Sequence, residues 1–292
     1  MKKLIALIPL SLIIFCVEAQ IKRKQTYNRP SDKKNTFLHK QWWIGIKGGG
    51  NLSSVDVDKT YSIITPTNYA ASDIKKKYES FSDPGAQVSL EATFYYRGFC
   101  ISVQPGYQRV AFNYENKFTW TDPEQSLLTV DLTYRQNHWM EYLTLPVVVR
   151  YEYPAGRFSP YVHAGFYSNI LLNANKELIV TGRDQSAGGP NDFESEPVVV
   201  GATDLFARYH YGVLGGIGTF YTLGNVRLNL EVQYRMGLSL LNSPENRYDN
   251  DRMSGMGDAM DDLRLNNLSV SIGTLFPLRF LSSGFKSSDN LK

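Results

Sequence analysis

The stretch from Arg227 to Leu241, RLNLEVQYRMGLSLL, alternates between apolar and polar side chains almost without interruption. Alternate positions from Leu228 onward hold only apolar or aromatic residues, while the positions between them include Arg227, Glu231 and Arg235. Successive side chains leave a β-strand on opposite faces, so this pattern predicts a strand with one apolar and one charged face. In a soluble protein the apolar face packs on a core. In an outer-membrane barrel it contacts lipid, and the charged face lines the interior.

The connections between candidate strands alternate strictly between short and long. The candidate strands cover residues 42–50, 85–96, 99–112, 139–153, 159–172, 207–222, 227–241 and 265–280. The short connections are 97–98, 154–158 and 223–225, and the long ones are roughly 51–84, 113–138, 173–206 and 242–264. This arrangement predicts an all-β fold, an eight-stranded antiparallel up-and-down transmembrane β-barrel. An even number of strands also places both termini on the side of the short turns, which we expect to be the periplasm.

The N-terminal residues predict export of the chain. A basic start, Met1-Lys2-Lys3, precedes the apolar run from Leu4 to Val17, and Val17 and Ala19 are the small residues that a signal peptidase requires. We therefore expect a signal peptide over residues 1–19, with an N-terminal anchor helix as the alternative. After it we expect a basic periplasmic leader over residues 20–41, the barrel over 42–280 and a periplasmic tail over 281–292. The leader's basic residues are Lys22, Arg23, Lys24, Lys33, Lys34 and Lys40.

Charged residues within the strands lie opposite the apolar ones and predict a charge network in the barrel lumen. They are Lys47, Glu91, Arg150, Glu152, Arg227, Glu231 and Arg235. Both signs are present, so these side chains can pair inside a small barrel, whereas an Arg or Lys facing lipid at the bilayer midplane costs about 2–4 kcal/mol. Many Gly and Ser residues share this face, and an eight-stranded interior needs small residues to make room for large ones.

Aromatic residues gather at the strand ends next to the short turns and predict an interfacial girdle. They are Trp42, Tyr95, Tyr96, Phe99, Tyr151, Tyr153, Tyr161, Phe220, Tyr221, Phe276 and Phe280. The alternative, a soluble lipocalin-like barrel or a sandwich, explains the alternation equally well but not the girdle or the loop asymmetry. We therefore expect the outer membrane as the location and its lipid as a partner.

Several segments resemble a known family. HWMEYLTLPVVVRYEY (residues 138–153) is similar to the "yLeiPlllkY" segment of PorT-like outer-membrane barrels of the Bacteroidetes, and SPYVHAGFYSNILL (159–172) resembles the segment that follows it there. The entry WWIGIKGGGNLS and the exit LNNLSVSIGTLF also look similar, so the resemblance covers about residues 42–280. It implies an eight-stranded barrel. One branch of the family, PorT itself, is an accessory part of type IX secretion and gliding.

The candidate reactive residues do not predict an enzyme or a cofactor. We expect His39 in the leader, His138 as a polar residue at the outer rim, and His163 and His210 in the lumen at opposite ends, too far apart to share a metal. Cys100 has lumen parity and is expected to be a packed, inert thiol.

The last long loop, NRYDNDRMSGMGDAMDDLR, offers weak candidates for divalent-cation ligands. These are Asp249, Asp251, Asp258, Asp261 and Asp262. Their spacing does not fit a calcium loop, and a solvated acidic loop is the simpler interpretation. The methionines of this loop are spaced to form a small apolar face that covers the barrel mouth or contacts a partner.

The sequence thus predicts a non-enzymatic outer-membrane barrel with a structural or accessory role in the envelope. A protein partner would bind through the long loops or the basic leader. With 31 basic and 28 acidic side chains the chain is nearly neutral, which argues against a nucleic-acid partner. A small transport or ligand-binding barrel is the alternative, although eight strands leave little lumen.

Overall fold

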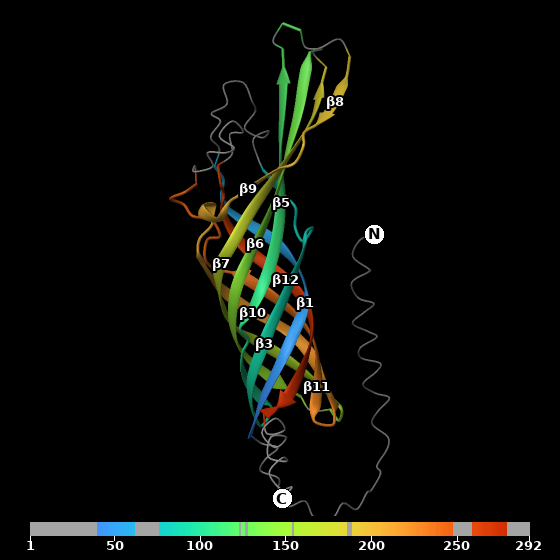
Figure 1. Ribbon diagram of the computed structural model, residues 1–292, viewed down its shortest axis with the longest axis vertical. Coiled ribbons are helices and arrows are strands. Elements are labelled where there is room, and N and C mark those ends of the chain that lie inside the picture. The colour runs from blue at the N-terminus through green and yellow to red at the C-terminus, as the bar shows by residue number, and fades with distance from the viewer. Residues whose placement is uncertain are drawn as a thin grey trace, which may run out of the picture. The chain divides into compact units, whose positions relative to one another are not determined.

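The computed structural model describes residues 40–61, 76–122, 124–125, 128–153, 155–185, 189–247 and 259–278 (Figure 1). No helix in this part of the chain has the length and apolarity needed to cross a bilayer. The strands are β1 (Lys40–Lys59), β2 (Lys77–Tyr78), β3 (Pro84–Tyr96), β4 (Phe99–Val103), β5 (Gly106–Thr121), β6 (Thr129–Glu152), β7 (Phe158–Asp184), β8 (Asn191–Glu194), β9 (Val198–Gly201), β10 (Tyr209–Leu223), β11 (Val226–Gly237) and β12 (Asp262–Pro277). A short 3-10 helix, η2, covers Thr203–Leu205.

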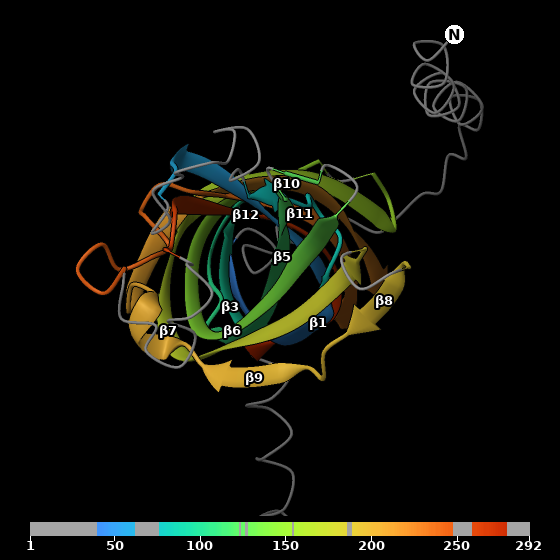
Figure 2. The same ribbon diagram turned by 90° about the horizontal axis from the view of Figure 1, so that it is seen from above.

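Eight antiparallel strands close into a ring, as the sequence predicts. β4 and β5 act as one of these strands, because both pair with β3 on one side and with β6 on the other. The ring then continues through β7, β10, β11 and β12, and β12 pairs with β1 along nearly its whole length. Figure 2 looks into this ring from above. Closure leaves no unpaired sheet edge around the barrel, which a lipid environment requires.

The apolar face of each strand points outward. Leu230 and Val232 are 49% and 41% exposed. Glu231, which lies between them, is 1% exposed, and Arg235, further along the same strand, is 5% exposed. The same alternation covers all of β6 from Leu143 to Tyr151. A soluble lipocalin-like barrel would have the opposite arrangement, so that alternative is wrong.

Glycines on the inward face let the strands approach each other closely. A Cβ atom at Gly216 would overlap the carbonyl oxygen of Val232 and lie 2.7 Å from the ring of His163. Its neighbour Gly215 faces outward, where a Cβ would meet only the carbonyl oxygen of His163 at 3.6 Å. The inward glycines therefore provide the room that the lumen side chains occupy.

Two of the predicted long loops are largely strand. β5 continues to Thr121 and β6 begins at Thr129, so only residues 122–128 connect them within the predicted loop 113–138. β7 likewise continues to Asp184 and pairs with β8 and β9. The upper parts of β5, β6 and β7 and the short β8 form a sheet, here called the extension, that rises beyond the ring (Figure 1). Several of its outward residues, such as Asp131, Thr133 and Arg135, are polar because they lie above the apolar belt, and this part of the sequence therefore resembles a loop.

Apolar clusters fill both ends of the barrel. At the loop end, Phe112, Tyr142 and Leu263 belong to a buried cluster to which Leu205 and Phe206, around η2, also contribute. At the turn end, the cluster comprises Trp43, Tyr161, Phe220 and Leu275, with Tyr95 packed against it.

This second cluster corrects the predicted girdle. Tyr161 and Phe220 are buried inside the barrel because they have inward parity, and Tyr95 faces inward with them. Trp42, Tyr96, Phe99, Tyr151 and Tyr153 do face outward near the turns. Phe280 lies outside the described residues.

Candidate functional site

The structure places all seven charged residues of the proposed lumen network inside the ring. Lys47 is on β1, Glu91 on β3, Arg150 and Glu152 on β6, and Arg227, Glu231 and Arg235 on β11. Each occupies an inward position of its strand. Six of them are buried, and the Arg227 side chain retains 17% exposure.

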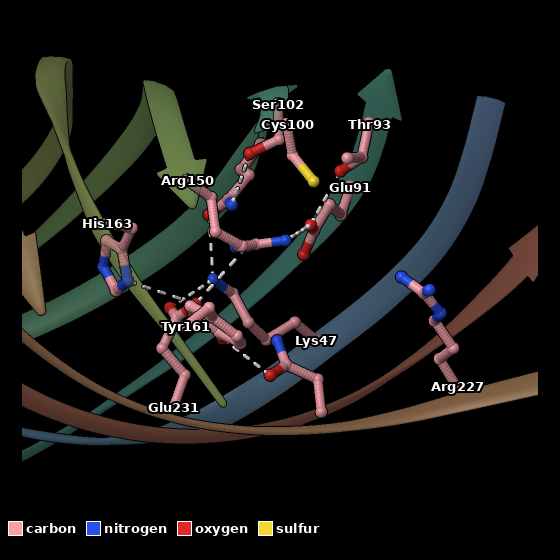
Figure 3. Close-up of polar contacts among 12 residues, drawn as sticks. Lys47, Glu91, Thr93, Cys100, Ser102, Arg150, Tyr161, His163, Arg227 and Glu231 are labelled. Atoms are coloured by element: carbon pink, nitrogen blue, oxygen red, sulfur yellow. Dashed lines mark hydrogen bonds and ion pairs between the residues drawn. The ribbon is translucent and has the colours of Figure 1, made fainter. Parts of the chain in front are cut away.

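Four of these residues form one alternating cluster of cations and anions (Figure 3). Lys47 Nζ lies 2.7 Å from Glu231 Oε1 and also donates to Gln104 Oε1 at 2.8 Å. Arg150 Nη1 lies 3.0 Å from Glu91 Oε1, and Arg150 Nη2 lies 3.6 Å from Glu231 Oε2. Glu231 thus joins the two cations, and the cluster connects four strands around the ring.

Tyrosine and threonine side chains add hydrogen bonds to the two carboxylates of the cluster. The Tyr161 hydroxyl lies 2.8 Å from Glu231 Oε2 and 2.7 Å from Asn229 Oδ1, and Thr93 donates to Glu91 Oε1 at 2.8 Å. The Arg150 guanidinium lies 4.5 Å from the centre of the Tyr161 ring. Buried ions persist only when they are paired, and each member of the cluster has an oppositely charged partner.

A second ion pair lies nearer the turns, apart from the first cluster. Arg227 Nη1 is 3.1 Å from Glu152 Oε2, and its guanidinium lies 4.5 Å from the centre of the Trp43 ring. The buried Cys100 thiol donates to Glu152 Oε1 at 3.0 Å. The Cys100 thiol therefore faces a carboxylate, whose negative charge disfavours the thiolate form that a nucleophile needs.

Arg235 is held by amides rather than by a carboxylate. Its Nη1 donates to Gln108 Oε1, and the Gln233 amide, turned so that its oxygen faces Arg235, accepts from Nε at 2.9 Å. The ring of Tyr167 lies 5.6 Å away. The structure thus brings six of the seven predicted residues into ion pairs and leaves the seventh in an amide site above them.

The histidines lie in separate environments. His163 Nδ1 is 4.0 Å from Glu231 Oε2 at the border of the main cluster. His138 is fully buried and stacks on Phe112 with ring centres 4.8 Å apart, so the expectation of a polar rim residue is wrong. It is an inward residue of β6, and the loop-end cluster covers it. His39 lies outside the described residues.

His210 forms a contact that the sequence did not predict. Its Nδ1 lies 2.7 Å from Ser239 Oγ, and its Nε2 lies 3.4 Å from the Tyr167 hydroxyl. Ser239 Oγ also accepts from the Tyr211 backbone N–H at 3.0 Å, just beyond the last β10–β11 pair, Gly212 with Gly237. The serine therefore completes backbone hydrogen bonding where the two strands separate. Nothing in the alternation marks this role.

Only two of the five aspartates proposed as weak cation ligands lie in the described part of the chain, Asp261 and Asp262. Asp261 is buried and accepts from the Tyr61 backbone N–H at 2.8 Å and from the Tyr78 hydroxyl at 2.7 Å. Asp262 Oδ1 pairs with Arg247 at 2.6 Å. The expectation of a solvated acidic loop is therefore wrong for Asp261. Met260 beside it is buried in the loop-end cluster.

No group of three His, Cys, Asp or Glu side chains suited to a metal ion occurs among the residues with a described position. The interior arrangement consists of matched ion pairs, amides and aromatic rings. Chemically it can neutralise charge and exclude water and ions from the lumen.

The match to a protein family agrees with this architecture. A family model for the outer membrane protein beta-barrel domain matches residues 19–242. Neisserial surface protein A is 14% identical, with 80% of this chain and 96% of that chain covered and a TM-score of 0.31. OprG from Pseudomonas aeruginosa is 16% identical, with 82% and 97% covered and a TM-score of 0.34. Ail of Yersinia pestis is 10% identical, with 81% and 99% covered and a TM-score of 0.30. No curated protein sequence matches the chain.

Proposed function

The chain belongs to the outer membrane protein beta-barrel domain family, and we propose that it is a closed, non-enzymatic barrel with a structural or accessory role in the cell envelope. The observation that carries this proposal is the interior cluster of Lys47, Glu91, Arg150 and Glu231. Its ion pairs join strands from around the ring, so the narrow lumen is occupied by paired charges.

The apolar clusters at the two ends support the same conclusion. The loop-end cluster places Phe112, Phe206 and Leu263 above the polar interior, and the turn-end cluster places Trp43 and Phe220 below it. An ion crossing the barrel would have to break ion pairs and pass both apolar layers. Desolvation makes this path unfavourable for a charged solute.

The extension is the surface that we propose for a protein partner. It carries the exposed side chains of Lys117, Trp120 and Phe193 and an exposed ion pair, Arg183 with Asp192. Aromatic side chains among polar ones are common in protein interfaces. Within this role we propose an accessory place beside a type IX secretion or gliding apparatus. The support for that finer proposal is the resemblance of residues 138–153 and 159–172 to PorT-like barrels.

We further infer that the turns and the termini face the periplasm and that the extension faces outward, as in barrels with short turns and long outer connections. Single cysteines test this orientation because native Cys100 is buried. Lys117→Cys in the extension should react with a membrane-impermeant maleimide on intact cells. Arg157→Cys in a short turn should react only after the cells are opened. The reverse labelling would overturn the orientation.

Conductance tests the closed barrel directly. Purified protein in a planar bilayer should show no steady, sizeable openings, and a porin in the same bilayer shows that the assay detects them. Steady openings of the wild-type protein would overturn the proposal and favour the small transport barrel instead.

A pull-down from detergent-solubilised outer membranes tests the accessory role. Full-length protein should retain a stable partner, and a secretion component among the retained proteins would support the finer proposal. Recovery of the barrel alone under mild detergent would count against an accessory role.

A further inference from the structure

A groove interrupts the lipid-facing surface of the barrel close to the short turns. It lies over the ends of β6, β7, β10 and β11 and has a volume of about 540 Å³. Pro160 and Thr219 form its floor, and Tyr153, Leu230, Val162 and Ile217 are among the residues around them. Its size is within the range of sites that hold small molecules, about 300–1,000 Å³.

The strand register explains why a depression forms at this point. Thr219 on β10 pairs with Pro160 on β7 and with Leu230 on β11. The Tyr153 N–H donates to the Pro160 carbonyl at 2.8 Å, which places Tyr153 beside Pro160 on the other flank. The row across β7, β10 and β11, together with Tyr153 just after β6, therefore has two short side chains in the middle and two long ones at its ends.

Larger side chains also close the groove along the strand direction. On the side away from the turns, Val162 pairs with Ile217, and both are exposed apolar residues. On the side of the turns, Phe158 and Tyr221 pack against each other with ring centres 4.9 Å apart. The depression is thus bounded on every side by side chains that project further into the membrane.

Inward contacts fix the floor of the groove. Tyr161 lies behind it, and its hydroxyl is held by Glu231 and Asn229. A Cβ at the neighbouring Gly218 would overlap the Tyr161 ring, so only glycine fits there. The interior charge cluster therefore holds the floor in place, and the groove exists without an occupant to shape it.

An exposed cation lies in the turn beyond the Phe158–Tyr221 side of the groove. Arg157 belongs to the β6–β7 turn, and its carbonyl accepts from the Thr222 N–H at 2.9 Å, which fixes this turn beside the end of β10. The apolar groove suits an acyl chain, and the exposed cation at the membrane surface suits the phosphate to which that chain is attached. We propose that this groove binds one phospholipid, with an acyl chain over Pro160 and Thr219 and the phosphate near Arg157. The choice of phospholipid rests on the orientation proposed above.

Native mass spectrometry of the full-length protein, extracted in mild detergent and supplied with phosphatidylglycerol, tests this inference. The wild-type protein should retain one phospholipid, and Thr219→Phe should lose it because the new ring fills the groove. Thr274→Phe is the matched control. Thr274 is also outward-facing and partly exposed, on β12, and does not line the groove. Heat-dependent migration on a gel verifies that each variant is folded. If Thr219→Phe does not fold, Pro160→Leu replaces it, because the leucine fills the same floor from β7.

A second arm tests the headgroup. Arg157→Gln should lower the retained fraction of phosphatidylglycerol several-fold and leave that of a neutral diacylglycerol unchanged. The inference is overturned if the wild type retains no lipid or if Thr219→Phe retains as much lipid as Thr274→Phe. It is also overturned if the protein retains lipopolysaccharide in preference to the phospholipid. A dimer that Thr219→Phe dissociates would overturn it too, because a second copy of the protein would then occupy the groove. None of these outcomes depends on conductance or on a protein partner.

Discussion

Glu231 is the residue on which the interior cluster depends most, because its carboxylate contacts Lys47, Arg150 and Tyr161 at once. Glu231→Gln keeps the shape of the side chain but leaves two buried cations with a single carboxylate, Glu91. Removing one partner of a buried ion pair typically costs about 3–5 kcal/mol. We expect a loss of this order in urea unfolding of the protein in lipid vesicles.

Asp192→Asn is the control for this measurement, since it removes a carboxylate from an ion pair that is exposed to solvent in the extension. Exposed ion pairs contribute little to stability, so its unfolding curve should match that of the wild type. Equal unfolding midpoints for Glu231→Gln and Asp192→Asn would contradict the role given to the interior cluster.

Cys100 provides a second test at the same scale. Its thiol is 1% exposed and donates to Glu152. We expect a maleimide to leave the folded protein unmodified and to label it fully in urea, as followed by intact-mass measurement. Labelling of the folded barrel within minutes would show that the interior near the turns is open to solvent.

Period-two alternation is enough to place these charged residues on the inward face, but it does not identify their partners. Lys47 and Glu231 are 184 positions apart, and their contact depends on how the strands are staggered around the ring. The girdle prediction fails at Tyr161 for a different reason, because it groups aromatic residues by their distance from the turns and ignores the inward parity of this one. The contact of Arg235 with Gln108 also arises only across the closed ring. The Ser239–His210 contact is local to β10 and β11 and depends on where these two strands separate.

Neighbouring glycines of β10 show how strongly the two faces of one strand differ. Gly216→Val would place methyl groups against the Val232 carbonyl and the His163 ring, whereas Gly215→Val projects into lipid. Overpacking of an interior typically costs about 1–3 kcal/mol. We therefore expect Gly216→Val to lower the urea midpoint and Gly215→Val to leave it nearly unchanged. Equal effects would mean that the interior is loosely packed.

Strand existence follows from the sequence, whereas strand ends do not. All eight predicted strands of the ring are present, but β5, β6 and β7 extend well beyond their predicted ends. Above the apolar belt the outward positions become polar, as at Asp131, Thr133 and Arg135, so the hydrophobic alternation fades while the backbone pairing continues. A strand prediction based on hydrophobic alternation alone therefore ends at the edge of the apolar belt, although the strand itself continues.

In the proposed function the barrel closes the lumen and the extension binds a protein partner. Removing most of the extension tests whether these two roles are separate. Asn116 on β5 pairs directly with Tyr134 on β6, so replacing residues 117–133 by Asn-Gly creates a two-residue hairpin at a natural pair. The β1–β12 closure and the interior ion pairs lie outside the deleted segment. We expect the shortened protein to keep the heat-dependent gel migration of a folded barrel and to lose the partner recovered with the full-length chain. Loss of the folded form would mean that the extension is needed to build the ring. Unchanged partner recovery would move the binding surface to another part of the chain.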